Sequence, residues 1–135
     1  MSESTNVPRE ERPQSPAAAI SNQMVYLFSK YFGRGPTRAR TTLNTNVVLI
    51  TMSDTLTKAE QNLIAAGEAE AVRSLRRTLQ GSMRAEAVAA IEEILRRKVV
   101  GYMADVDTDA NMGVVAFVLA PVVETGLVEV ADAET

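Results

Sequence analysis

The chain has 135 residues, 46% of them hydrophobic, and it contains neither histidine nor cysteine. This length suits one domain, and the missing residue types exclude cysteine nucleophiles, Ser-His-Asp relays and zinc sites built from histidine and cysteine. The formal net charge of −3 argues against broad binding to nucleic acid or to anionic membrane surfaces. We therefore expect a protein that is not an enzyme, holds no metal or cofactor, and does not bind nucleic acid.

Residues 1–14 are mostly polar and include Pro8 and Pro13, so we expect a disordered tail there and not a leader peptide. No apolar run is long enough to cross a bilayer, which predicts that the chain does not insert into membranes. The absence of cysteine is compatible with a reducing cytoplasm, where we expect this protein to be located.

The first helix is predicted to begin after Ser15, which is a good N-cap residue, with Pro16 at the first helical position. Apolar residues then recur at helical spacing as far as Tyr31. Gly33 is a natural helix end.

The first β-hairpin is predicted over residues 37–43 and 47–52. In the first strand, Arg38 and Arg40 lie on one side and Thr41 on the other, an alternation that is typical of a half-buried strand. The second segment is almost wholly apolar, as in strands that lie inside a sheet.

Two helices follow. Thr57 and Glu60 have the spacing of a capping box, which predicts a helix start at Thr57. Gly67 ends or bends this helix, and a longer helix is predicted over 68–96. Gly81 lies within it and costs about 1 kcal/mol relative to alanine, so we expect either a local bend or a close packing partner there.

A second hairpin is predicted from two strands at 99–106 and 112–119, with turn-forming residues between them. That turn belongs to a D-x-D-x-D-x-N pattern starting at Asp105, which resembles the opening of a calcium loop. Ala110 stands where an EF-hand needs glycine, and Ala116 where it needs a bidentate glutamate. The pattern therefore predicts a hairpin loop and no metal site.

The resulting order, α-β-β-α-α-β-β, predicts an α+β fold. We expect a two-layer sandwich in which an antiparallel four-stranded sheet, made of two β-hairpins, carries helices on one face. A single domain should span residues 15–121, followed by an acidic segment over 122–135, where a short edge strand near 127–131 is one option. Such a sheet leaves edges exposed, and pairing such edges or faces about a two-fold axis would remove this liability, so we expect a homodimer.

Glycines and arginines between the first helix and the first strand indicate a site for an anion or a partner. Gly33 and Gly35 would allow close backbone approach, while Arg34 and Arg38 would hold a carboxylate or phosphate. The alternative is structural: the glycines shape a turn, and the arginines are solvated or pair with acidic groups.

Arginines on the long helix are expected to extend this surface. The alternative is that acidic residues of the same helix, such as Glu70, neutralise them. The predicted anion- or partner-binding site therefore comprises Gly33, Arg34, Gly35, Arg38, Arg73, Arg76 and Arg77.

Four short motifs stand in a fixed order within residues 20–121. They are the GRGP turn at Gly33 to Pro36, Leu56-Thr57-x-x-Glu60, Val72-Arg73-x-x-Arg76, and the ending Val115-Ala116-Phe117-Val118-Leu119. In these motifs the chain resembles a small bacterial family called YbcI or MpsC, catalogued as a Na⁺-translocating membrane-potential-generating system family. The chain departs from the family pattern at Arg96 to Lys98, where a glycine often precedes the third strand, and at Ala104, where a serine is frequent.

The resemblance implies an accessory role beside membrane proteins that support membrane potential or the uptake of inorganic carbon and cations, and it supplies no catalytic residues. The leading hypothesis is a non-catalytic cytoplasmic accessory protein that binds a membrane transport subunit. The alternative is a sensor or regulatory domain that binds a small anion or a nucleotide at the same glycine turn.

Overall fold

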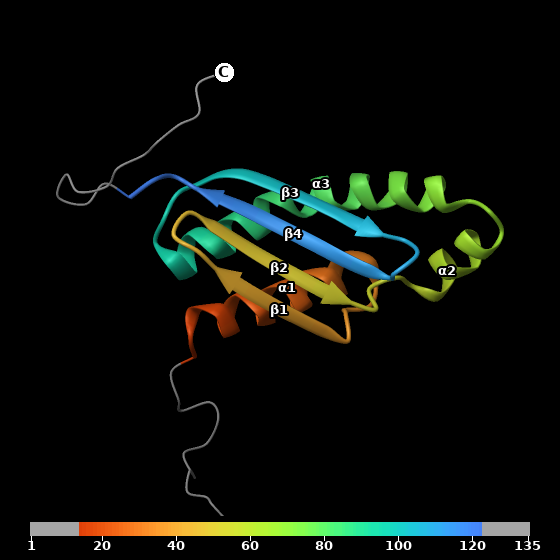
Figure 1. Cartoon of the computed structure of the whole chain (residues 1–135), viewed down its shortest axis with the longest axis horizontal. Helices are drawn as coiled ribbons and strands as arrows, with labels where there is room; N and C mark the ends of the chain where they lie inside the picture. The colour runs from red at the N-terminus through yellow and green to blue at the C-terminus, as the bar shows by residue number, and fades with distance from the viewer. Residues whose placement is uncertain (1–13, 123–135) are drawn as a thin grey trace, which may run out of the picture.

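Helices and strands follow one another in the predicted order, α-β-β-α-α-β-β (Figure 1). They are seen in a computed structural model of the chain, which describes residues 14–122. The elements are α1 (Pro16–Phe32), β1 (Arg38–Leu43), β2 (Val47–Ser53), α2 (Lys58–Ala65), α3 (Ala69–Leu95), β3 (Val99–Asp107) and β4 (Met112–Leu119). The predicted α+β class is confirmed. The edge strand considered near 127–131 and nearly all of the predicted tail lie outside the described residues, and the domain limits stay a prediction.

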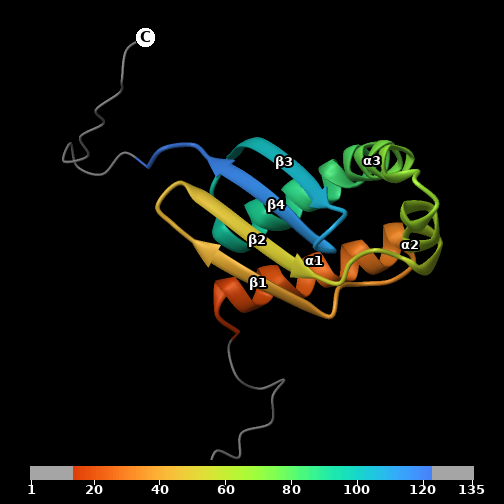
Figure 2. The same ribbon diagram turned by 45° about the vertical axis from the view of Figure 1, so that its right-hand side comes forward.

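The four strands form one antiparallel sheet in the order β1-β2-β4-β3. Each predicted hairpin is a pair of neighbours, and the pairing of β2 with β4 joins the two hairpins. Helices α1 and α3 lie against the same face of the sheet, as the two views in Figures 1 and 2 show. The predicted two-layer arrangement is thus confirmed, and no element within residues 14–122 covers the other face.

Capping interactions set the helix ends that the sequence predicts. Ser15 Oγ accepts a hydrogen bond from the N–H of Ala18 at 3.1 Å, and Gly33 ends α1 with a φ of 85°. At the start of α2, Thr57 Oγ1 accepts from the N–H of Glu60 at 3.1 Å, and the Glu60 carboxylate accepts from the N–H of Thr57 at 2.8 Å. The predicted capping box is therefore formed.

The core lies between the two helices and the sheet. Its largest buried apolar side chains include Ile20, Met24 and Phe28 of α1, Met83 and Ile91 of α3, and Ile50 and Phe117 of the sheet. Burial of each such side chain contributes roughly 1.5–3 kcal/mol. The contact between layers is therefore the main source of stability.

Gly81 lies in the middle of α3 and is exposed. A Cβ atom built on it would meet nothing within 4 Å. The close packing partner that we considered for Gly81 is therefore wrong for the described part of the chain.

Candidate functional site

Arg76 of α3 is buried where this helix meets α2 and the end of β2. Its Nε and Nη2 atoms donate to the two carboxylate oxygens of Glu60 at 2.9 and 2.7 Å, and Nη2 also donates to the Thr55 carbonyl oxygen at 2.7 Å. The side chains of Arg76 and Glu60 are only 1% and 4% exposed. The guanidinium also lies 4.2 Å from the centre of the Phe32 ring. A ligand cannot reach Arg76 unless Glu60 is displaced, so Arg76 has a structural role in place of the predicted binding role.

The ionisation of Glu60 is tied to this contact. Burial by itself raises the pKa of the Glu60 carboxyl, but the hydrogen bonds from Arg76 and Thr57, together with the charge of Arg76, hold the pKa below its usual value. Glu60 is therefore ionised near neutral pH. The pair is a compensated charge pair, not a proton donor and acceptor poised for catalysis.

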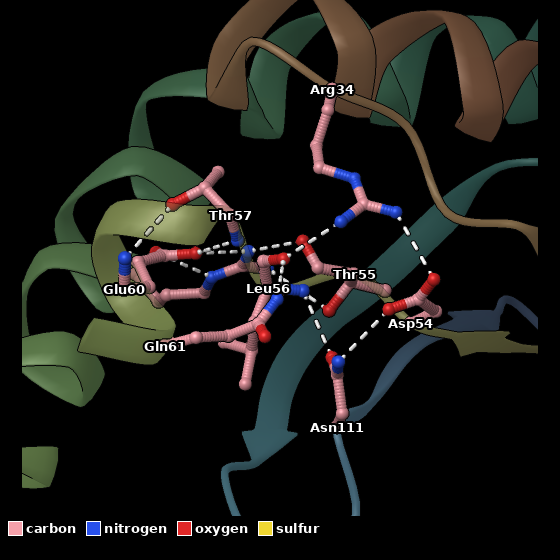
Figure 3. A network of polar contacts seen from close by, with 9 residues as sticks. Arg34, Asp54, Thr55, Leu56, Thr57, Glu60, Gln61 and Asn111 are labelled. Carbon is pink, nitrogen blue, oxygen red and sulfur yellow. Dashed lines mark hydrogen bonds and ion pairs between the residues drawn. The ribbon is translucent and has the colours of Figure 1, made fainter. Parts of the chain in front are cut away.

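Arg34 holds the segment that links β2 to α2 (Figure 3). Its Nη1 donates to the Leu56 carbonyl oxygen at 3.0 Å, and its Nη2 donates to Asp54 Oδ2 at 3.2 Å. The Asn111 amide donates to Asp54 Oδ1 at 3.0 Å, and Asn111 Oδ1 accepts from the N–H of Leu56 at 2.9 Å. Asp54 has a φ of 59°, which is uncommon for a residue with a side chain. Arg34 and Asn111 thus hold a sharp turn in place.

The two glycines of the GRGP turn are explained within the chain. Gly33 has the left-handed conformation of a helix C-cap, with a φ of 85°. A Cβ on Gly35 would lie 2.6 Å from Ser29 Oγ and 3.3 Å from Val25, both in α1. Gly35 is therefore small because α1 passes close to it, and neither glycine requires a ligand as its explanation.

Arg73 and Arg77 lie on the exposed side of α3 and share one acidic partner. Arg73 Nε lies 3.1 Å from Glu70 Oε1, and Arg77 Nη2 lies 2.9 Å from Glu70 Oε2. Arg73 also donates to Thr108 Oγ1 at 3.2 Å. The sequence leaves open that acidic residues of the same helix neutralise these arginines. Glu70 does so. The arginine side chains are still 38% and 59% exposed, so a partner can reach both.

Arg38 lies on the face of the sheet that the helices leave uncovered. Thr41 of the same strand pairs with the buried Ile50, and its hydroxyl lies 2.8 Å from the Ser21 hydroxyl of α1. Because side chains alternate along a strand, Arg38 and Arg40 point away from the helices. The alternation predicted for this strand is confirmed.

We call the uncovered face of the sheet the open face. Its side chains form cross-strand rows, written in the order β1, β2, β4, β3: Arg38-Ser53-Met112-Asp107, Arg40-Thr51-Val114-Asp105 and Thr42-Leu49-Ala116-Met103, followed by Val47, Val118 and Gly101 of the last three strands. The centre of the open face is therefore largely apolar. One edge is basic and the opposite edge is acidic.

The apolar centre of the open face is exposed. Leu49 and Met112 of the two central strands have exposed fractions of 36% and 42%, and Met103, beside them on β3, has one of 57%. An antiparallel sheet with one solvated face normally alternates apolar and polar residues, whereas β2 and β4 carry apolar residues on both faces. A contiguous exposed apolar patch is a mark of protein association. The predicted site residues do not identify this face, although the apolar run of β2 is its signal in the sequence.

The acidic edge flanks a hollow of about 290 Å³ in the open face. Asp107 Oδ1 accepts from the N–H groups of Asp109 and Ala110 at 3.0 and 3.1 Å, and Asp105 Oδ1 accepts from the N–H of Val106 at 2.8 Å. The predicted hairpin loop is thus present, and Asp107 stabilises its turn. Within residues 14–122, no group of three or more His, Cys, Asp or Glu side chains is arranged to hold a metal ion.

The structure therefore separates the predicted site residues into three places. Arg34 and Arg76 stabilise the β2–α2 junction, although Arg34 keeps 35% of its side chain exposed, and Gly33 and Gly35 shape the chain where α1 ends. Arg73 and Arg77 lie on the outer side of α3, and Arg38 lies on the open face.

Comparison with known proteins gives one match. The family model described as Na⁺-translocating membrane potential-generating system (MpsC) matches residues 14–121. No curated protein and no solved structure matches the chain. Of the three helices between residues 14 and 122, none is both long and apolar enough to cross a membrane.

Proposed function

The chain belongs to the MpsC family, and on this basis we propose that it is a non-catalytic accessory protein that binds a subunit of a membrane ion or bicarbonate transport system. In this proposal the protein is cytoplasmic and homodimeric, and it acts by association with other proteins. The family description, which names a Na⁺-translocating membrane potential-generating system, supports the connection to a membrane system.

The observation that carries the proposal is the open face. Its apolar centre, with Leu49 and Met112 exposed, is costly to leave in water and favours association with another protein. The exposed arginines of α3, Arg73 and Arg77, offer a second surface for an acidic partner. The anion-sensor alternative has less support, because the glycines and Arg76 of its expected site have internal roles.

The test is capture of partners from the native host. The tagged full chain is incubated with detergent-solubilised membranes and with cytosol, and bound proteins are quantified by mass spectrometry. Leu49→Lys places a charge on the open face. Leu63→Lys is the matched control, because Leu63 is a similarly exposed leucine of α2, with 39% exposure against 36% for Leu49.

We expect the wild-type chain and Leu63→Lys to enrich a subunit of an ion or bicarbonate transporter, and Leu49→Lys to lose it. The double variant Arg73→Ala/Arg77→Ala reports whether the α3 surface adds to capture. Enrichment of no transport subunit by the wild-type chain would contradict the proposed function.

A further inference from the structure

We infer that the open face is covered by the open face of a second copy, with the two-fold axis parallel to the strands and between β2 and β4. The inference rests on the proposed function, because it assigns the homodimer of that proposal to the open face; the transport subunit then binds the surface that the dimer leaves free, such as the exposed arginines of α3. A two-fold axis in this direction places β1 over the partner's β3, and β2 over the partner's β4. It also keeps each cross-strand row opposite the same row of the partner.

The charges of the two edges match in this arrangement. The first row places Arg38 opposite the partner's Asp107, and the second row places Arg40 opposite the partner's Asp105. By symmetry, each pair occurs twice. The two arginines take part in no ion pair within residues 14–122, and the bonds seen for each aspartate use only its Oδ1 atom. Both partners thus retain hydrogen-bonding capacity for a pair between chains.

The two-fold axis could also lie between the sheets but perpendicular to the strands. In that arrangement the charges of the facing edges do not match. It places β1 over the partner's β1 and β3 over the partner's β3. The basic edge then faces a basic edge and the acidic edge faces an acidic edge, which is unfavourable. Charge complementarity therefore selects the axis parallel to the strands.

Side-chain sizes match in the same arrangement. The third row places Leu49 opposite the partner's Ala116, and Met103 opposite the partner's Thr42. Each contact thus joins a large side chain to a smaller one, which allows two facing sheets to interdigitate.

Sheet twist does not remove these pairs. Facing sheets cross at about 30°, which displaces the edge strands by roughly 4 Å, about one residue, relative to the central strands. An arginine side chain can span such a shift, whereas the pairs near the axis are little affected. In the first two rows the edge contacts are accordingly those of charged side chains, and the central contacts are mostly apolar.

The area of the open face suits a reversible dimer. Four strands about 4.8 Å apart and about seven residues long at roughly 3.4 Å each give a flat area of about 450 Å² per copy. Two such faces, with the added relief of their side chains, come to roughly the 1,000 Å² that a specific interface needs. The dimer should therefore dissociate as the protein is diluted.

The oligomeric state of the purified full chain tests the inference. Sedimentation velocity over a concentration series should show a monomer–dimer equilibrium for the wild-type chain and for Leu63→Lys, and only monomer for Leu49→Lys. Arg40→Asp and Asp105→Arg should each weaken dimerisation roughly tenfold, since each turns two attractive contacts into repulsive ones. An equimolar mixture of these two variants should recover the wild-type affinity. Arg77→Asp, an equal charge change on α3, should leave the dimer unchanged.

Cross-linking through introduced cysteines tests the direction of the axis. The chain itself contains no cysteine, so only the introduced residues react. In the inferred dimer, residue 40 lies roughly 10 Å from the partner's residue 105, the spacing of facing sheets, but roughly 17 Å from the partner's residue 40. A short bismaleimide should therefore join Arg40→Cys chains to Asp105→Cys chains in a mixture. It should join Arg40→Cys chains to one another poorly.

Three results would overturn the inference: a wild-type chain that stays monomeric at millimolar concentration, a Leu49→Lys variant that dimerises normally while folded, or efficient cross-linking of Arg40→Cys chains alone. Circular dichroism checks the folding of each variant. A dimer with the expected cross-links that captures no transport subunit would refute the proposed function alone. A monomeric wild-type chain whose capture of a transport subunit is lost in Leu49→Lys would refute the dimer and leave the binding of a transport subunit in place.

Discussion

At the scale of single residues, Arg76 and Glu60 form the most deeply buried ion pair within residues 14–122. Removal of one partner from such a pair leaves an uncompensated charge in the interior, which typically costs 3–5 kcal/mol. We therefore expect Arg76→Ala to lower the free energy of unfolding by about 3–5 kcal/mol, a large fraction of the roughly 5–15 kcal/mol of a typical domain. Urea unfolding followed by circular dichroism measures this loss.

Arg77→Ala is the matched control, because Arg77 belongs to the same helix and also pairs with a glutamate. Its side chain is 59% exposed, whereas that of Arg76 is 1% exposed. An exposed pair contributes at most about 1 kcal/mol. Equal losses for the two variants would show that Arg76 is not buried as described.

The lowered pKa of Glu60 predicts a loss of stability in acid. A carboxyl whose pKa is lower in the folded state binds its proton more tightly in the unfolded chain, so its contribution is present above the unfolded pKa of about 4.3 and is lost as pH falls through the folded pKa. We expect the free energy of unfolding to be nearly constant between pH 7 and about 5 and to fall below about pH 4.3. Urea titrations across this range measure it.

The non-titrating variant Glu60→Gln should show a shallower decline in acid than the wild-type chain. Some decline remains, because the pKa values of Glu70 and Glu86 are also lowered, by hydrogen bonds from Arg77 and Arg73 and from Tyr31 and Lys30. An identical pH dependence for Glu60→Gln would contradict the assignment to Glu60.

At the scale of helices and strands, the sequence predicts most of the fold because the relevant signals are local. Ser15 and the Thr57–Glu60 capping box act within one helical turn, and the two hairpins join strands that are close in the chain. The role of Arg76 is not local, since its partner Glu60 is 16 residues away on another helix. Helical spacing places Arg76, but not Arg77, on the buried stripe with Val72 and Met83, whereas the identity of its partner Glu60 follows only from the packing of α3 against α2.

Two glycines near or within α3 give opposite predictions. Gly81 is in the helix interior with open space around it, so Gly81→Ala should raise the free energy of unfolding by roughly 0.5–1 kcal/mol. Gly67 has a φ of 86°, which an alanine adopts only with strain, so Gly67→Ala should lower it by roughly 1 kcal/mol. Thermal or urea unfolding of both variants measures the direction of each change in the free energy of unfolding. Destabilisation by Gly81→Ala would show that a neighbouring group packs closely on this side of α3.

At the scale of the whole molecule, the open face is the feature that the sequence describes least directly. The apolar run of β2 indicates a strand covered on both sides, and α1 and α3 cover only one side. Which charges line its edges depends on strand order: β1 and β3 become opposite edges only because β2 pairs with β4. That pairing is between distant segments, so the sequence predicts a homodimer in general terms without the face or the residues that would form it.

The inferred dimer makes stability depend on protein concentration. Only the folded chain forms the dimer, so mass action stabilises the fold as the protein concentration rises. Over a hundredfold increase above the dissociation constant, we expect a gain of about 1–2 kcal/mol per chain, or roughly 5 °C or more in the unfolding midpoint. Scanning calorimetry or fluorimetry over that range measures it.

Leu63→Lys should keep the dependence of the midpoint on concentration, and Leu49→Lys should lose it while its midpoint stays near that of the dilute wild-type chain. A wild-type midpoint that does not change with concentration would mean that the open face is not covered by a second copy when the protein unfolds.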